Sequence, residues 1–97
     1  MDDDRFVWHA SRDEINQWKH GVGFLEALEA FADPRAIYAV DAAHSAAEPR
    51  WFCIGRARRG IITVRFTRRG ATIRLIGAGY WRKGRNIYEK EKDRLPG

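Results

Sequence analysis

The sequence of 97 residues has a single cysteine, Cys53, one methionine and three prolines. One cysteine excludes an internal disulfide, and its place in the apolar run WFCIG predicts a small buried residue rather than a reactive thiol. No stretch approaches the roughly 20 apolar residues that cross a bilayer, and the first residues, MDDDR, are acidic where a secretory signal is basic and then apolar. These absences predict a cytoplasmic protein that does not contact a membrane.

Motifs for nucleotides, metals and nucleophilic catalysis are also missing. The chain has no phosphate-binding loop, dinucleotide fingerprint or Cys-x-x-Cys pair, and its histidines, His9, His20 and His44, are far apart. Ser45 beside His44 lacks the glycines of a hydrolase nucleophile turn, so nothing indicates a Ser-His-Asp triad. We therefore expect neither a metal nor another cofactor.

Acidic residues are scarce in the second half of the chain. Residues 1–49 hold four Lys/Arg and ten Asp/Glu, a net charge of −6, whereas residues 50–97 hold fourteen and three, a net charge of +11, in agreement with +5 for the whole. Such a basic half is typical of proteins that bind polyanions, although scattered arginines serve solubility equally well.

The hydrophobic pattern predicts one α+β domain over residues 1–97. Strands are expected over residues 5–8, 36–40, 50–56, 61–67 and 71–76, and helices over 12–19, 24–33 and 86–94. Ser11 and Glu14 match a capping box for the first helix, Gly21 is a natural stop for it, and Pro34 ends the second. Both N-terminal helices are too short to stand alone, so we expect them to pack on one face of the sheet.

Two alternating segments about a turn at Gly70 form the expected centre of a small, mainly antiparallel sheet. Their inward set is Ile62, Val64, Phe66, Ala71, Ile73 and Leu75. In the preceding strand the alternation is blurred, and we place Trp51 and Cys53 inside and Phe52 and Ile54 outside. Because successive strand residues point to opposite faces, Arg65 and Arg74 project away from the core and make a cationic sheet face.

The segment after Ile76, GAGYWRKGR, combines three glycines with cations and two aromatic residues. The glycines predict a loop whose backbone approaches another group closely rather than an ordinary helix start. Guanidinium groups bind phosphates and aromatic rings stack on unpaired bases, so this composition suits RNA. The alternative is that Tyr80, Trp81 and Tyr88 are core aromatics that anchor the last helix.

RNA also carries its own nucleophile. A 2′-hydroxyl that attacks the adjacent phosphorus needs a base, charge stabilisation and a proton donor, which Arg, Lys, Tyr or His can supply without a metal. The catalytic candidates are Arg65, Arg74, Arg82, Lys83, Tyr88 and His44, and the RNA-binding candidates are Lys19, His20, Arg50, Arg56, Arg68, Arg69, Tyr80, Trp81 and Arg85.

A series of short motifs runs through nearly the whole chain in one order. They are FVW at 6–8, KHGV at 19–22, F-x-E-A and F-A-D-P between 24 and 34, D-x-x-H-S at 41–45, E-x-R-W at 48–51, then F-T-x-R-G, I-R-x-I and Y-E. In this series the chain resembles BrnT, the toxin family of a bacterial type II toxin–antitoxin pair. The resemblance implies a RelE-like fold, with helices on one sheet face and a catalytic surface on the other, and a ribonuclease that inhibits translation and growth.

The resemblance also implies partners, and we assign roles to the catalytic candidates ourselves. A cognate BrnA-like antitoxin would neutralise the toxin and bind operator DNA through its own fold, in a higher-order complex. Arg65 and Arg74 would grip the scissile phosphate. Arg82 and Lys83 would stabilise the developing charge, and Tyr88 or His44 would transfer protons.

One segment departs from the family pattern. Where the family pattern implied by the resemblance has Ser-Ala-Arg and then a glutamate, this chain has Gly77-Ala78-Gly79 and no acidic residue until Glu89. Either Arg82 or Lys83 replaces the missing charge from a shifted loop, or the toxin is weakened. The rival interpretations are a basic module that binds RNA or a partner protein without catalysis, and a purely structural subunit.

Overall fold

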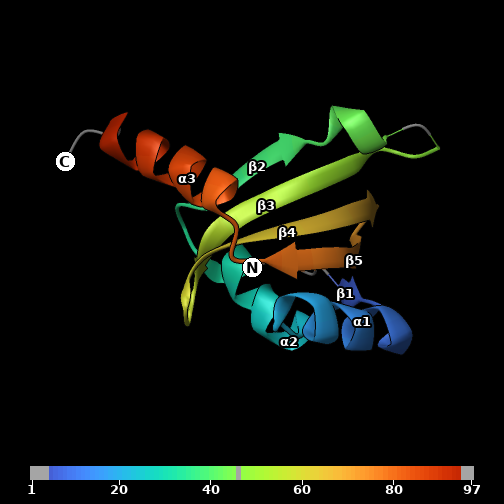
Figure 1. Cartoon of the computed structure of the whole chain (residues 1–97). Helices are drawn as coiled ribbons and strands as arrows, with labels where there is room; N and C mark the ends of the chain where they lie inside the picture. Colours follow the sequence, from blue (N-terminus) through green and yellow to red (C-terminus); the bar gives the residue numbers. More distant parts are fainter. Residues whose placement is uncertain (1–4, 46, 95–97) are drawn as a thin grey trace.

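The computed structural model describes residues 5–45 and 47–94 (Figure 1). Its elements are β1 (Arg5–Val7), α1 (Ala10–His20), α2 (Phe24–Ala27), the 3-10 helix η1 (Leu28–Ala32), β2 (Ile37–Val40), the 3-10 turn η2 (Ala42–His44), β3 (Arg50–Ala57), β4 (Gly60–Arg69), β5 (Thr72–Gly79) and α3 (Arg82–Arg94). The predicted α+β class is confirmed. None of the helices in the described ranges is long and apolar enough to cross a membrane.

The five strands form one sheet in the order β1-β5-β4-β3-β2. The three pairings among β2, β3, β4 and β5 are antiparallel, as the hairpin pattern predicts. β1 joins the edge of the sheet as expected but runs parallel to β5, so the sheet is mixed. The reason is the connection: residues 8–71 lie between these two strands, and so long a connection permits a parallel neighbour that a tight turn cannot make.

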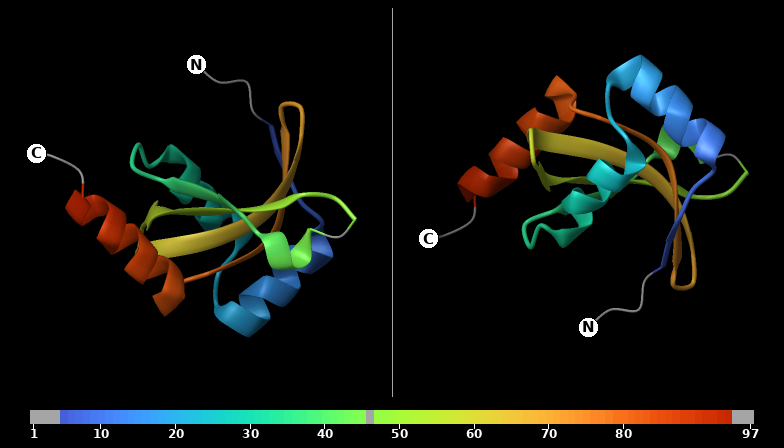
Figure 2. Two further views of the ribbon diagram at one scale, coloured as in Figure 1. Left: turned by 90° about the horizontal axis from the view of Figure 1, so that it is seen from above. Right: turned by 90° about the horizontal axis from the view of Figure 1, so that it is seen from below.

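The main core lies on one face of the sheet, under α2 and η1. It contains Ile62, Val64, Phe66, Ile73 and Leu75 of the predicted inward set, together with Phe24, Ala27 and Ala30 of the helical segment. The sixth predicted residue, Ala71, is exposed, because the turn extends to it and β5 begins only at Thr72. Cys53 is fully buried in this core and Trp51 packs against it, which confirms the predicted inward pair of β3. Figure 2 shows α2 and η1 on this side of the sheet and α3 on the other.

Helix α1 does not pack on the core face with α2, so the expectation for the two N-terminal helices is wrong. It lies at the outer edge of β5 (Figure 2), and its one buried residue is Asn16. The Asn16 side chain donates to the carbonyl of Ala78 (2.9 Å) and accepts from the Ala78 amide (3.1 Å). The Asn16 side chain thus provides hydrogen-bond partners for the backbone N–H and C=O of β5 at a position that β1 is too short to reach. Consequently Ile15 and Trp18 remain 53% and 86% exposed.

The start of α1 also differs from the prediction. The helix begins at Ala10 with His9 as its N-cap residue, and no side chain caps it, so the capping box at Ser11 does not form. Asp13 in the first turn instead accepts a hydrogen bond from the Phe24 amide (2.8 Å), which ties α1 to the start of α2. The predicted stop is confirmed, because Gly21 adopts a left-handed conformation (φ 69°).

The segment after Ile76 is not a loop. β5 continues to Gly79, and α3 begins at Arg82, four residues before the expected start. The expected close approach does occur, since a Cβ atom at Gly84 would overlap the Thr63 hydroxyl where α3 lies on β4. The sequence suggested a break in the helix because glycine has a low helix propensity. The close contact between α3 and β4 that Gly84 permits cannot be seen from the local sequence.

Helix α3 encloses a second, smaller core on the opposite face of the sheet. Ile54, Ile61 and Tyr88 are buried there, with Phe52 and Ile37 packed around them. Phe52 and Ile54 point away from the main core, as predicted for β3. However, Ile54 is only 3% exposed, because α3 covers that end of the face.

Candidate nucleic-acid interface

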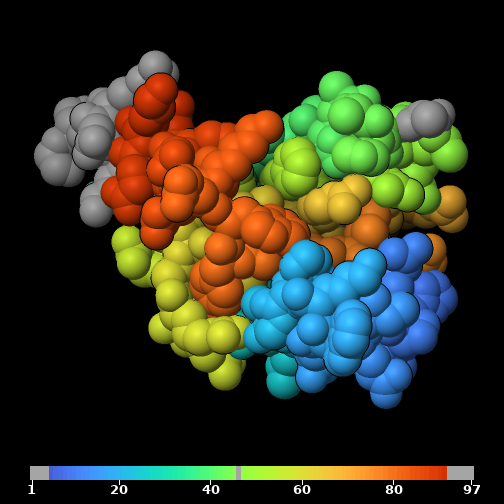
Figure 3. Space-filling model, in the orientation of Figure 1, coloured from blue at the N-terminus to red at the C-terminus, as the bar shows by residue number. Residues whose placement is uncertain are grey.

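The part of this second face that α3 leaves uncovered is hollowed and basic. Two adjoining hollows, of about 290 and 120 Å³, share Arg12, Arg50 and Ile76 in their walls. The larger also contains Lys19 and Arg65, and the smaller contains Arg74. We call the two together the basic trough. In Figure 3, atoms of β4 and β5 lie at its floor, between α1 and the segment around η2.

Rigid strands position the arginines of the trough floor. Arg65 lies in β4 opposite Gly77, and Arg74 lies in β5 opposite Thr67. Between these pairs the register shifts, from Arg65 opposite Gly77 to Phe66 opposite Leu75, so Ile76 is the extra residue of a β-bulge. Ordinary alternation turns Ile76 into the trough, and the bulge lets Gly77 line it as well, while Leu75 and Ala78 stay in the core. Arg65 and Arg74 thus share a face, as predicted, without being direct partners.

The trough holds positive charge that carboxylates do not neutralise. Among the described residues, no carboxylate lies within ion-pair distance of Arg12, Arg50 or Arg74. Glu48 lines the smaller hollow but pairs with Arg69, with 3.5 Å between its Oε2 and the arginine Nε. A concave surface lined by one sign of charge attracts a polyanion and raises its local concentration.

His44 lies beside the trough, at the end of η2. Its Nδ1 is 3.0 Å from Oδ2 of Asp41, and the same carboxylate oxygen is 3.7 Å from Nε of Arg65. The structure therefore brings His44 and Arg65, two of the predicted catalytic residues, to a common carboxylate that the sequence did not single out.

Trp81 forms one end of the trough. The indole is half-buried and meets the His20 ring edge-on, with 5.2 Å between ring centroids. A Cβ atom at Gly79 would lie 2.5 Å from the indole, too close for any other residue in this arrangement. The glycine that departs from the family pattern is therefore what allows the indole to occupy this position, and Lys19, His20 and Trp81 all reach the trough as predicted.

Tyr80, Arg82 and Arg85 line a separate hollow of about 290 Å³ on the far side of Trp81. The Tyr80 hydroxyl donates to Glu26 (2.5 Å), and burial together with this bond raises the pKa of Tyr80 above its ordinary value. The alternative interpretation, an anchoring aromatic, fits Tyr80 better than base stacking does. Arg82 is exposed and does not line the trough.

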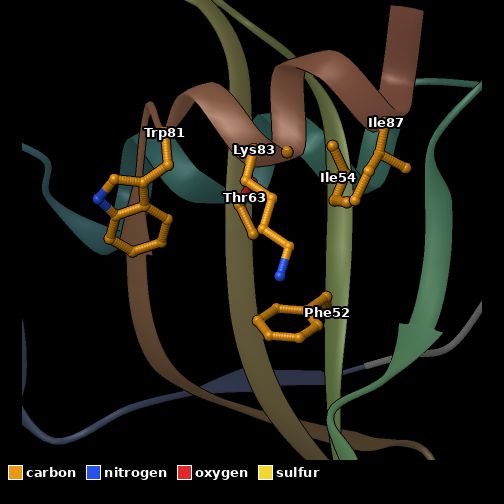
Figure 4. Close-up of a pocket in the computed structure, with 7 residues that line it drawn as sticks. Phe52, Ile54, Thr63, Trp81, Lys83 and Ile87 are labelled. Atoms are coloured by element: carbon orange, nitrogen blue, oxygen red, sulfur yellow. The ribbon is translucent and has the colours of Figure 1, made fainter. Parts of the chain in front are cut away.

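Lys83 lies on the other side of the start of α3. Figure 4 shows its side chain reaching from the helix toward the ring of Phe52, in an apolar groove of about 280 Å³ that Ile54 and Ile87 also line. Neither Lys83 nor Arg82 faces the trough, so the structure does not support their expected role in stabilising charge at the scissile phosphate.

Tyr88 is held in the second core rather than at the trough. It is 3% exposed, and its hydroxyl donates to Oδ2 of Asp33 (2.8 Å). Burial and this hydrogen bond raise the pKa of Tyr88. Arg56, another RNA-binding candidate, lies over the Tyr88 ring at 6.0 Å from its centroid. These contacts hold Tyr88 away from the trough and fit the alternative interpretation, an aromatic residue that anchors α3.

Arg68 and Arg69 lie at the end of β4, beside the turn. Arg68 Nε donates to the Gly70 carbonyl (2.9 Å), and Arg69 is exposed. Arg50, by contrast, lines both hollows of the trough.

Arg12 was not predicted from the sequence, although its spacing of seven residues from Lys19 places both on one helix face. Asp41 begins the D-x-x-H-S motif, and its spacing of three residues from His44 was the one local signal for this pair.

A comparison with protein-family models matches residues 8–84 to the ribonuclease toxin, BrnT, of type II toxin–antitoxin systems. The chain belongs to the BrnT family. A comparison with individually curated proteins found no match. The matched range contains every residue of the trough and ends within the first turn of α3, so Tyr88 lies outside it. Members of this family are described as ribonuclease toxins, and ribonuclease activity is what the motif series predicts.

Proposed function

We propose that this BrnT-family toxin is an endoribonuclease that binds RNA in the basic trough and cleaves it without a metal ion. The observation that carries the proposal is the group of trough cations, Arg12, Lys19, Arg50, Arg65 and Arg74, on one concave face. Guanidinium groups bind phosphate oxygens through paired N–H donors, and rigid strands hold them in place before the substrate arrives. Arg65 and Arg74 grip the scissile phosphate, and the others bind its neighbours.

The proposed reaction uses the substrate's own hydroxyl. His44 takes the proton of the 2′-hydroxyl, the 2′-oxygen forms a bond to phosphorus, and the bond from phosphorus to the 5′-oxygen breaks. Arg65 and Arg74 stabilise the added negative charge of the pentacoordinate state, the leaving 5′-oxygen takes up a proton from water, and His44 then returns its proton to the solvent. The products are a 2′,3′-cyclic phosphate and a 5′-hydroxyl end.

Single-turnover cleavage of a single-stranded RNA by saturating protein tests this proposal. We expect cleavage to persist in EDTA and the products to carry cyclic phosphate. Arg65→Ala and Arg74→Ala are each expected to slow the chemical step about 10²-fold, equivalent to about 3 kcal/mol, with little loss of binding. Arg68→Ala, at the end of β4, is expected to weaken binding slightly and leave the chemical step unchanged.

Three results would count against the proposal. Cleavage that stops in EDTA and returns with magnesium would contradict metal independence. A 3′-hydroxyl product would exclude attack by the 2′-oxygen. RNA binding without any cleavage would support the alternative, a non-catalytic binding module, for which the glycine at position 79 is the best argument.

We further propose that a cognate, BrnA-like antitoxin masks the trough with an acidic or amphipathic segment and carries the complex to operator DNA. The trough cations that have no carboxylate partner among the described residues, Arg12, Arg50 and Arg74, favour electrostatic steering of such a segment. Induced expression of the toxin alone is expected to inhibit translation and growth, and expression of the adjacent antitoxin gene to relieve the arrest. The association rate of the pair is expected to fall as salt rises; a rate independent of salt would place the interface elsewhere.

A further inference from the structure

The Asp41 carboxylate is unusually enclosed for a charged group in a loop. Its side chain is 5% exposed, and a carboxylate is rarely buried to this extent unless other groups compensate its charge. Two groups contact it: the His44 ring, with Nδ1 within hydrogen-bond distance of both oxygens (3.2 and 3.0 Å), and the Arg65 guanidinium, a charge of opposite sign with Nε at 3.7 Å from Oδ2.

The backbone around Asp41 is fixed by a closed set of hydrogen bonds. The Asp41 amide donates to the carbonyl of Arg50 (2.7 Å), and the Ser45 hydroxyl donates to the carbonyl of Asp41 (2.7 Å). The Arg50 amide donates in turn to the Ser45 hydroxyl oxygen (2.9 Å). These bonds join the turn to the start of β3, a strand that contributes Arg50 to the trough. The carboxylate is thus held at a fixed place relative to the trough floor.

The contact to His44 selects one form of its ring. A carboxylate at Nδ1 favours the neutral tautomer with the proton on Nδ1, which leaves the lone pair on Nε2. The His44 side chain is 58% exposed, so this nitrogen is open to solvent or substrate. A ring fixed at one nitrogen with a lone pair at the other has the arrangement required of a general base.

The contact to Arg65 is of a different kind. The Arg65 side chain is 28% exposed and lines the trough, but its Nε is buried and has no hydrogen-bond partner among the described residues. The nearby carboxylate compensates the charge without a hydrogen bond at 3.7 Å. Asp41 therefore attracts the guanidinium to this side of the trough without taking up a hydrogen bond from its Nε–H.

We infer that Asp41 is a positioning residue that joins His44 and Arg65 into one unit at the trough wall. This inference rests on the proposed cleavage of RNA. The unit places a proton acceptor, Nε2 of His44, beside a cation that binds the phosphate. Proton removal from the 2′-hydroxyl and stabilisation of the new charge on phosphorus then occur at adjacent groups. Asp41 itself touches no substrate atom.

The tautomer is tested directly by the ¹⁵N shifts of the imidazole nitrogens of the whole protein, with His44→Gln to assign the His44 signals. We expect the wild-type shifts to show a proton on Nδ1 and a lone pair on Nε2 when the ring is neutral. In Asp41→Asn that preference should be reduced or reversed. Wild-type shifts that show the opposite tautomer, or equal populations, would overturn the inference without any need for the variant to fold.

Kinetics supply the second test. Asp41→Asn is expected to lower kcat about 10²-fold or more while KM changes less than about twofold, because the residue acts on the reacting groups rather than on RNA binding. The matched control is Glu29→Gln, which makes the same chemical change in a carboxylate paired with Arg58 at the opposite end of the sheet. It should keep the wild-type kcat, and melting curves of both variants show whether each is folded.

The outcomes separate the inference from the proposed function. If the wild type cleaves RNA and a folded Asp41→Asn variant cleaves at the same rate, the inference is wrong and the proposed function stands. If the wild type binds but never cleaves RNA, the proposed function fails and the inference fails with it as a catalytic statement, whatever the tautomer.

Discussion

Two groups of arginines in this chain have opposite electrostatic surroundings. At the turn between β3 and β4, Arg58 pairs with Glu29 (2.5 Å) and Arg59 pairs with Glu26 (2.8 Å). In the trough, Arg50 and Arg74 lie near no carboxylate that the described part of the chain places within ion-pair distance. Both groups are accessible to solvent, so exposure does not distinguish them.

The difference comes from the helices rather than from the arginines. Glu26 and Glu29 lie three residues apart on the α2–η1 segment, so both face the turn. Glu26 also accepts from the Tyr80 hydroxyl, and the Arg59 guanidinium lies 5.0 Å from the Tyr80 ring centroid. These arginines join α2 and η1 to the strands, whereas those of the trough are left for a ligand. Net charge alone therefore does not locate a binding surface.

The largest expected effect is on chemistry. Arg74→Ala should slow single-turnover cleavage about 10²-fold, because a charge preorganised at the reacting phosphate is lost. Arg58→Ala should leave the rate within about twofold, since its charge is already compensated by Glu29. An equal loss of cleavage rate in the two variants would mean that the whole basic surface contributes, and that paired and unpaired arginines do not differ in function.

The next effect is on stability. Glu26→Gln should lower the free energy of unfolding by about 1 kcal/mol, because it removes a partly buried charged acceptor, with an allowance for solvent screening. Glu48→Gln, whose carboxylate pairs with the exposed Arg69, should change stability by less than about 0.5 kcal/mol. Urea denaturation of both variants measures the difference. A larger loss for Glu48→Gln would reverse the assignment of structural and ligand-binding regions.

A smaller effect is expected on RNA affinity. Arg50→Ala should weaken binding about threefold at moderate salt and reduce the slope of log affinity against log salt by about one, because one phosphate contact is lost. Arg59→Ala should leave that slope unchanged. Fluorescence anisotropy with a short labelled RNA at several salt concentrations tests both. An unchanged slope for Arg50→Ala would place the RNA outside the trough.

The smallest effect is on the pH dependence of stability. The hydrogen bond from Arg59 outweighs burial and, with that from Tyr80, lowers the pKa of Glu26 below its ordinary value of 4.5. A lowered carboxyl pKa contributes stability above the ordinary pKa, and this contribution is lost as the pH falls through the folded-state value. The difference in unfolding free energy between wild type and Glu26→Gln should therefore shrink from about pH 6 to about pH 3. A difference that stays constant or grows would contradict the ion pair.

Part of the site could be predicted from sequence. Alternation along β4 and β5 correctly placed Arg65 and Arg74 on the face opposite the core, because side-chain direction in a strand is a local property of the backbone. The same reasoning assigned Tyr88 to catalysis, and the structure buries it instead. Whether an aromatic ring faces a ligand or a second core depends on where α3 lies, and its own residues do not specify that.

The sequence by itself determined the α+β class, the antiparallel centre of the sheet, the burial of Cys53 and the BrnT family. These follow from periodicity, turn chemistry and ordered motifs, which the chain carries over short distances. Only the tertiary structure decided which arginines are neutralised and that Asp41 joins His44 to Arg65. Those facts depend on contacts such as that between Glu29 and Arg58, 29 residues apart. Coulombic interactions act through space, so the same positive charge binds a helix in one place and stays open to RNA in another.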